Sequence, residues 1–438
     1  MRRLMWLVAF GACLPSTALV PANAAALEER AAMAPLPTFA DSALHLDQVV
    51  RSVLARNPSL AAASAAWAEA RARTRQSGAL TDPMLDVMVA PRSLGASRVG
   101  PGYRVGVSQL FPLFGQRGLQ RRIAEAEARG SGWDFRAAQL DLIHETRLAF
   151  IDYWRIGRAI TVNRELLQLL PEFRRVSLAK YSAGLVGQQE PLQVDAEIAM
   201  LDHEAVVLER ERRVAVAILN VLMHEPAGAY LAPPPRDLPV PDTTLVHADL
   251  GPRARALRPE LRAADVRVEA RRSELALARR QQSPEMAFGV AYDRFWSEPE
   301  LRTTVGITMN LPVYPGRRSA SRAEARARLA ASESRSQVVR DSVELQVETS
   351  AARLHEQAHD VQIARERLLP LRERTLRAAR ASYEANRTDF LTVLNSLRDF
   401  LRARLEADES MAMLLEARAD LDRALGEIPA QLSQEFEP

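Results

Sequence analysis

The 438-residue sequence contains one cysteine, Cys13, and one lysine, Lys180. Because Cys13 lies in an N-terminal apolar stretch, removal of that stretch would leave no thiol and would exclude disulfide bonds. Aromatic residues make up only 5% of the chain, and the formal charge of +3 is small for this length, so charge does not indicate a nucleic-acid partner. After the N-terminal stretch there is no run of 18 apolar residues, which excludes a hydrophobic transmembrane helix.

The first 24 residues have the pattern of a secretory signal peptide. The charged pair Arg2-Arg3 precedes the apolar stretch Leu4–Ala12, and Ala22–Ala24 fits the small-x-small rule for cleavage. The alternative interpretation is a lipoprotein with an acylated Cys13. Phe10 is a poor residue three positions before such a cysteine, so the sequence favours cleavage after Ala24.

The chain repeats itself at an offset of 200 to 202 residues. Val105–Phe114 corresponds to Val305–Tyr314, and Tyr181–Gly184 corresponds to Tyr383–Asn386. A short period would indicate a solenoid, whereas two long copies predict an internally duplicated fold. Alanine, arginine, leucine and glutamate are abundant, which is typical of long helices and coiled coils.

Each repeat is predicted to contain a helix begun by a proline, two strands, a long helix and a shorter return helix. The predicted domains are a signal peptide at 1–24, an N-terminal extension at 25–43, a first repeat at 44–225, a proline-rich linker at 226–252, a second repeat at 253–426 and a C-terminal tail at 427–438. The strands are expected at 84–90, 102–111, 285–293 and 302–311, the long helices at 116–182 and 317–382, and the return helices at 191–223 and 391–425.

The predicted strands alternate apolar residues with polar or small ones, and each has about the length that crosses a tilted bilayer. Four strands cannot close a barrel, and an open edge in lipid leaves backbone groups unpaired. We therefore predict that several chains share one transmembrane β-barrel, and three chains would supply twelve strands. The side chains predicted to face lipid are Val105, Val107, Phe288, Val290, Val305 and Ile307. Those predicted to face the channel are Arg104, Ser108, Thr304, Thr308 and Asn310.

The long helices are predicted to continue this barrel as a tube. Sixty-seven helical residues would be about 100 Å long. A coiled-coil seam is indicated by apolar residues at intervals of seven: Val347, Leu354, Val361 and Leu368. Local bends are expected at Gly130, Gly132, Pro171 and Pro370. The predicted fold class is mainly α with a small β part, in which long antiparallel helical hairpins form an α-barrel that extends the shared β-barrel.

This organisation resembles the TolC-like outer membrane efflux protein family over residues 44–426. Tyr181–Val186 matches the family's turn, an aromatic residue, two further residues and then Gly-Leu-Val. Tyr383–Asn395 is similar to the family's second turn, Tyr-x-x-Gly-x-Arg-Thr followed by Asp-Val-Leu-Asp, but asparagine stands in place of the glycine. Uncharged Thr392 and Asn395 replace the family's gate aspartates. The segment Gln109–Arg117 is similar to the heavy-metal efflux members.

The resemblance implies a homotrimeric channel of the outer membrane with a long periplasmic extension and no cofactor. Such a channel is the passive export duct of a tripartite efflux system, coupled by a periplasmic adaptor to an inner-membrane pump of the RND type. The similarity of Gln109–Arg117 implies heavy-metal cations as cargo, and drugs or secreted polypeptides are the alternatives. The tip residues implied to contact the adaptor are Gly184, Leu185, Val186, Asn386, Arg387 and Thr388. The candidate entrance-gate residues are Glu190, Asp389, Thr392 and Asn395.

Two alternatives are considered from the residues alone. The segment His355–His359 matches H-E-x-x-H, the zinc motif of metalloproteases. It adjoins the seam residue Leu354 on a long helix and has no evident third ligand, so a solvated helix face is favoured. His355 and His359 are then weak metal candidates at most, and no enzyme activity is predicted. The alternative function is a soluble periplasmic coiled-coil adaptor or scaffold, which would lack lipid-facing strands.

Overall fold

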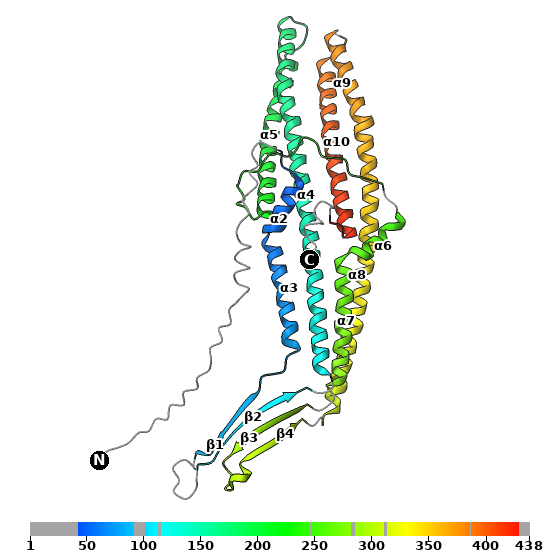
Figure 1. The fold of residues 1–438 in the computed structure, drawn as a ribbon. Helices are drawn as coiled ribbons and strands as arrows, with labels where there is room; N and C mark the ends of the chain where they lie inside the picture. Colours follow the sequence, from blue (N-terminus) through cyan, green and yellow to red (C-terminus); the bar gives the residue numbers. More distant parts are fainter. Residues whose placement is uncertain are drawn as a thin grey trace, which may run out of the picture. The chain divides into compact units, whose positions relative to one another are not determined.

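The structure, a computed structural model, describes residues 43–91, 101–112, 115–244, 247–281, 285–310, 313–385 and 387–428 (Figure 1). The first repeat contains α2 (Leu46–Arg56), α3 (Pro58–Ser77), β1 (Met84–Val89), β2 (Tyr103–Phe111), α4 (Gln116–Ser182) and α5 (Gln189–Leu222). The second repeat contains α6 (His247–Leu257), α7 (Pro259–Arg280), β3 (Met286–Asp293), η3 (Pro299–Leu301), β4 (Thr303–Met309), α8 (Pro315–Ile363), the π-helix η4 (Ala364–Leu368), α9 (Leu369–Glu384) and α10 (Phe390–Leu425). The predicted signal peptide with Cys13 lies outside the described residues.

The two repeats have matching elements in the same order, beginning with a pair of short helices, α2–α3 or α6–α7. The second helix of each pair starts at a proline, Pro58 or Pro259, whose missing N–H is not needed in the first turn. Asn57 caps α3, because its side chain accepts a hydrogen bond from the Ser59 backbone N–H at 2.9 Å.

The linker was predicted to end at residue 252, but α6 already begins at His247 and contains Pro252. Pro252 removes one helical hydrogen bond and would ordinarily end a helix. Here Leu250 and Ala254 lie one turn apart and are both buried against the core. That burial offsets the lost bond, so the proline stretch is shorter than its composition indicates.

The long helix of the first repeat is continuous over Gln116–Ser182, including Pro171. Its counterpart is divided by η4, which precedes Pro370 at the start of α9. Pro370 has no N–H for the carbonyl group one turn earlier, and a π-turn accommodates such a defect by taking in an extra residue. This changes the phase of the seam: Val347, Leu354 and Val361 are buried, but Leu368 is 44% exposed and Ala364 is buried instead. The prediction for Leu368 was wrong for this reason.

The largest core cluster joins the two repeats. Trp154 of α4 is 1% exposed and packs with Leu250 of α6, Leu354 of α8 and Met411 of α10. The halves therefore form one hydrophobic core rather than two separate domains. In the part of the chain that the structure describes, no helix is both long enough and apolar enough to cross a membrane.

The four strands form one antiparallel sheet in the order β1-β2-β3-β4, at the end of the helices opposite the α4–α5 and α9–α10 turns (Figure 1). Each repeat contributes two neighbouring strands, and β2 pairs with β3 across the repeats. The predicted fold class, mainly α with a small antiparallel sheet, is confirmed.

Two glycines that end helices allow a controlled test of packing. Gly184 and Gly426 both have positive φ, 70° and 79°, in the left-handed region that disfavours a side chain. A Cβ at Gly184 would meet nothing within 4 Å, whereas one at Gly426 would lie 3.0 Å from the backbone of Leu257 and Arg258.

We expect Gly184→Ala to lower the free energy of unfolding by about 1–2 kcal/mol, the cost of the left-handed conformation. Gly426→Ala should lower it by a further 1–3 kcal/mol or so, because the added methyl group must displace backbone atoms. Urea denaturation followed by far-UV circular dichroism measures both variants. Equal losses would contradict the close approach at Gly426.

Candidate functional site

One face of the sheet is apolar across all four strands. The register places Leu85, Val107, Val290 and Val305 side by side in one row. A neighbouring row contains Phe288 and Ile307, and Val105 follows Val107 on the same side of β2. Val305 is 78% exposed and Ile307 is 60% exposed. The structure thus brings the six predicted lipid-facing residues onto one surface, which no described helix covers (Figure 1).

The opposite face is mostly polar or small on β2, β3 and β4. It contains Ser108, Thr304 and Thr308 of the predicted channel residues, because these alternate with the apolar set. Arg104 lies on this face too, in register with Asp293. Asn310 has a structural role instead: its side chain accepts a 2.7 Å hydrogen bond from the Glu285 backbone N–H, which ties the end of β4 to the start of β3.

Aromatic residues mark both ends of the apolar face, a feature that the sequence interpretation missed. At the end far from the helices, Tyr103 and Tyr292 have ring centroids 6.2 Å apart, and Phe295 and Trp296 are exposed in the following loop. At the helical end Phe111 and Phe288 are 5.7 Å apart, and Tyr314 is exposed. Aromatic girdles flank the apolar band of proteins whose strands cross a bilayer. Their spacing along the alternating strands was the available sequence signal.

The two outer strands each have one unpaired edge. Among the residues that the structure describes, β1 pairs only with β2, and β4 pairs only with β3. Because every neighbouring pair is antiparallel, β1 and β4 also run in opposite directions. The free edge of β4 in one copy can therefore continue as an antiparallel pair with β1 of the next copy, a head-to-tail contact that closes into a ring.

The α4–α5 and α9–α10 turns lie together at the other end of the helices, and we call this region the tip (Figure 1). At the first turn the Leu185 N–H donates to the Lys180 carbonyl at 3.0 Å, and the Gly184 N–H donates to the Tyr181 carbonyl at 2.9 Å. These two bonds define a Schellman motif. At the second turn the Arg387 N–H donates to the Ser382 carbonyl at 2.8 Å, the equivalent closing bond. Asn386 lies outside the described residues.

The remaining predicted tip residues are presented on the surface. Leu185 is exposed, as is Arg387, while Val186 and Thr388 are partly exposed. An exposed apolar turn next to an exposed guanidinium is a surface suited to a partner protein.

The tip also contains a link between the repeats that involves the only lysine. The Lys180 ammonium group donates a 2.9 Å hydrogen bond to the Tyr383 carbonyl oxygen and lies 3.6 Å from the Tyr383 ring centroid. The Tyr383 hydroxyl in turn donates to the Glu190 carboxylate at 3.2 Å. Tyr383 also packs edge-on against Phe390. Thus α4, α5 and α9 meet at one buried tyrosine ring.

The candidate gate residues fall into two separate groups. Glu190 belongs to the Tyr383 link. Asp389 is the N-cap of α10, where its carboxylate accepts hydrogen bonds from the Thr392 backbone N–H at 3.2 Å and from the Thr392 hydroxyl. These bonds lower the pKa of Asp389. Asn395 is exposed on the same helix, one turn beyond Thr392. Asp389 and Thr392 therefore stabilise the helix start.

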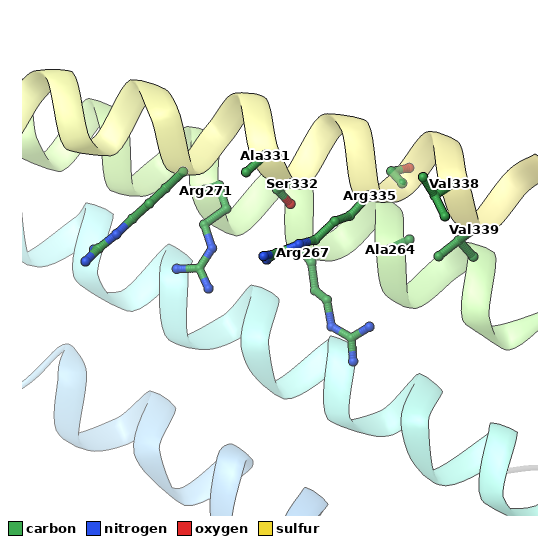
Figure 2. A pocket seen from close by; sticks show the side chains of 10 residues that line it. Ala264, Arg267, Arg271, Ala331, Ser332, Arg335, Val338 and Val339 are labelled. Carbon is green, nitrogen blue, oxygen red and sulfur yellow. The ribbon is translucent and has the colours of Figure 1, made fainter.

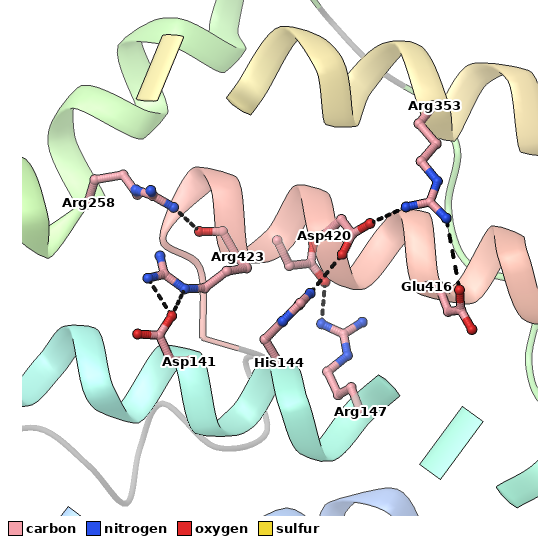
Figure 3. Close-up of polar contacts among 9 residues, drawn as sticks. Asp141, His144, Arg147, Arg258, Arg353, Glu416, Asp420 and Arg423 are labelled. Carbon is pink, nitrogen blue, oxygen red and sulfur yellow. Dashed lines mark hydrogen bonds and ion pairs between the residues drawn. The ribbon is translucent and has the colours of Figure 1, made fainter. Parts of the chain in front are cut away.

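A layer of charged residues joins α4 and α8 to the C-terminal end of α10 (Figure 3). Asp420 of α10 lies 2.7 Å from the His144 Nε2 atom of α4 and 2.8 Å from an Arg353 nitrogen of α8. Arg423 forms an ion pair with Asp141 of α4 at 2.6 Å. Burial raises the pKa of the neighbouring Glu416. Since each pair joins different helices, the layer sets how the helices align, whereas the apolar core supplies most of the stability.

Other surfaces are less informative. A groove of about 850 Å³ between α7 and α8 is lined by four arginines, among them Arg267 and Arg335 (Figure 2). The Arg267 Nη2 group donates hydrogen bonds to both carboxylate oxygens of Asp134, at 2.8 and 2.7 Å. His355 and His359 are exposed on α8 beside buried Leu354. Among the described residues, no group of three or more His, Cys, Asp or Glu side chains is placed to hold a metal ion.

Comparison with known proteins agrees with this architecture. Residues 250–427 match the family described as outer membrane efflux protein. Similar solved structures include CusC, with a TM-score of 0.76, 16% identity and coverage of 87% of this chain and 92% of that one. The outer membrane protein VceC from Vibrio cholerae has a TM-score of 0.74, 18% identity and coverage of 87% and 96%. The open state of the MtrE outer membrane channel of Neisseria gonorrhoeae has a TM-score of 0.74, 20% identity and coverage of 87% and 89%. No curated protein matches the chain significantly.

The fold and the family match define the class of protein. The described chain has the fold of the TolC-like channels. Its residues 250–427, which include almost the whole second repeat, match the model of the outer membrane efflux protein family. The resemblance inferred from the sequence is confirmed.

Proposed function

We propose that this protein is the outer-membrane channel of a tripartite efflux system, a passive duct rather than an enzyme. The observation that carries the proposal is the exposed apolar face of the sheet, bounded by aromatic residues at both ends and by two free strand edges. In water such a face would be a severe aggregation hazard. In a bilayer the same face is stabilised by lipid, provided that neighbouring copies pair the edges.

The protein acts as a homotrimer in this proposal. Three copies joined head to tail give a closed twelve-stranded barrel with the apolar face outward and the polar face inward. The helices then extend into the periplasm, where the exposed tip residues Leu185, Val186 and Arg387 contact the adaptor, and the adaptor connects the duct to an inner-membrane pump of the RND type. The similarity of Gln109–Arg117 to heavy-metal efflux members supports metal cations as cargo. A periplasmic adaptor, the alternative function, would have no use for the exposed apolar face of the sheet.

The proposed entrance is closed by the link at Tyr383. Opening requires the α9–α10 hairpin to separate from the α4–α5 hairpin, which would break the bonds of Lys180 to Tyr383 and of Tyr383 to Glu190. The closed state is thus stabilised by contacts that exist only when the two hairpins lie together.

We expect Tyr383→Phe to raise the leak conductance of the purified channel in planar bilayers. The variant keeps the ring but removes a hydrogen bond worth about 1 kcal/mol, which corresponds to roughly a fivefold change in the ratio of open to closed tips. Tyr181→Phe is the matched control, because Tyr181 is the exposed counterpart in the first repeat. Equal conductance of the two variants would remove Tyr383 from the gate.

The same link predicts how the leak depends on pH. Burial raises the pKa of Tyr383 to about 12, and repulsion from Glu190 adds to the shift. Because this pKa lies above the ordinary value of 10, the stabilisation by the neutral hydroxyl is complete below about pH 10 and is lost as the pH rises towards 12. The leak conductance of the wild-type channel should therefore rise between about pH 10 and pH 12. The leak conductance of Tyr383→Phe should not change over the same interval.

A further inference from the structure

The polar face of the sheet has few large side chains on β2, β3 and β4. On β1 the same face has two methionines and an aspartate. On β2, β3 and β4 this face contains mainly small residues: Gly106, Ser108, Ala287, Gly289, Ala291, Thr304, Gly306 and Thr308. Larger side chains of these strands lie towards the ends: Arg104, Leu110 and Asp293. At Gly106 the packing itself requires a small residue, because a Cβ there would lie 2.8 Å from that of Ala291.

Strand β1 differs, because on this face it presents Met84, Asp86 and Met88. Their register partners on β2 are Ser108, Gly106 and Arg104. Met84 is 64% exposed and Met88 is 59% exposed, although the apolar face was available for methionine and holds Met286 and Met309. The Asp86 side chain is also exposed, and its carboxylate forms no hydrogen bond or ion pair with any residue that the structure describes. The Asp86 carboxylate, between the thioethers of Met84 and Met88, therefore projects from a face that otherwise has mainly small side chains.

We propose that Met84, Asp86 and Met88 form a transit site for soft monovalent cations, Cu(I) or Ag(I), on the inner wall of the channel. Thioether sulfur is a soft ligand that selects such ions over the harder divalent cations, and the carboxylate supplies the opposite charge. The inference rests on the proposed function, since only a closed barrel turns this face into a lumen. Each trimer then contains three such transit sites, one on each chain. We call the Met84, Asp86 and Met88 side chains of one chain a column.

Strand geometry determines how an ion is held. Alternate residues of a strand are about 7 Å apart, so Met84 and Asp86 can share an ion, and so can Asp86 and Met88. The two methionines are about 14 Å apart and cannot bind one ion together. Asp86 thus belongs to two weak two-ligand sites. Weak binding at adjacent sites is what conduction requires, because an ion must leave as readily as it enters.

The neighbouring charges give the column a direction. Met84 lies at the helical end of β1, next to the uncharged Ser108, whereas Met88 is in register with Arg104 at the far end. The Arg104 guanidinium group disfavours a cation beside Met88 relative to one beside Met84, and Asp293 offsets this only in part because it lies one strand further from Met88. An ion that arrives from the helical tube is bound first between Met84 and Asp86. It is released at the far end of β1, beside Met88 and Arg104.

The test is to titrate the purified, detergent-solubilised trimer with Ag(I) and to measure binding by isothermal titration calorimetry. The double variant Met84→Leu/Met88→Leu keeps apolar side chains of similar volume but removes both sulfur atoms. Met286→Leu/Met309→Leu is the control, with the same chemical change on the opposite face of the sheet. Because the two sites of each chain share Asp86, they hold one ion at a time, so we expect the first variant to lose Ag(I) binding equal to one ion per protomer and the control to keep it. Asp86→Asn should weaken these sites roughly fivefold.

Unchanged Ag(I) binding by the Met84→Leu/Met88→Leu trimer would overturn the transit site, and so would an equal loss in the control. Neither result affects the proposed channel, which is tested separately by the oligomeric state of the wild-type protein from light scattering and by its conductance. If the wild-type protein formed neither a trimer nor a conducting pore, the proposed function itself would fail.

Discussion

Arginine at both Val107 and Ile307 is expected to abolish assembly of the protein in the outer membrane. Both side chains are exposed on the apolar face of the sheet, within the band between the aromatic residues. A charge on the lipid face costs about 2–4 kcal/mol at the bilayer midplane. Two arginines cost each chain about 4–8 kcal/mol, a large part of the 5–15 kcal/mol or so that stabilises an ordinary folded domain. The measurement is the amount of heat-resistant trimer in isolated outer membranes.

The control places the same charge on the other face. Thr308→Arg lies on β4 next to Ile307 but points to the polar side of the sheet, so it should assemble at close to the wild-type level. If Val107→Arg/Ile307→Arg reached the membrane as efficiently as Thr308→Arg, the apolar face would not contact lipid. Normal yields of a folded, water-soluble double variant would favour the adaptor alternative.

The second large effect is expected in the core that joins the repeats. Trp154→Ala should lower the free energy of unfolding by about 3–5 kcal/mol, because it removes the largest fully buried side chain and leaves a cavity among α4, α6, α8 and α10. The loss should appear in urea denaturation as a lower midpoint for both repeats together. Separate transitions for the two halves would contradict a shared core.

Trp133→Ala is the matched control on the same helix. Trp133 is only partly buried, and Arg136 lies over its ring at 5.2 Å. Its removal deletes the same number of atoms but leaves a site open to water, so a loss of about 1 kcal/mol is expected. A comparable loss in both variants would show that Trp154 is not the centre of the core.

Local periodicity made most elements predictable. The helix expected over 116–182 extends over Gln116–Ser182, and the strands lie within a residue or two of their expected positions. Alternation also placed Val107 and Val305 on the same face, since a strand has no freedom to turn alternate residues otherwise. Leu368 is the exception. The π-helix η4 shifts which side of the helix each later residue faces, and a count of sevens in the sequence does not reveal that shift.

The candidate site was predictable only in part. The tip turns could be found because they end long helical patterns and contain the residues that such ends require. The role of Asp389 was not evident, since the same carboxylate can line a pore or cap a helix, and its hydrogen bonds to Thr392 decide between the two. The Tyr383 link was missed because Tyr383 and Glu190 are 193 residues apart in the chain.

The sequence by itself determined the duplication, the element lengths and the alternation of the strands, because each of these is a property of neighbouring residues. Only the tertiary structure decided which strand edges stay free, where the aromatic residues gather and which side chains meet at the tip. It also aligned Met84, Asp86 and Met88 against a wall of small residues, because register between strands depends on contacts over long separations in the chain. Function here depends mainly on these long-range contacts.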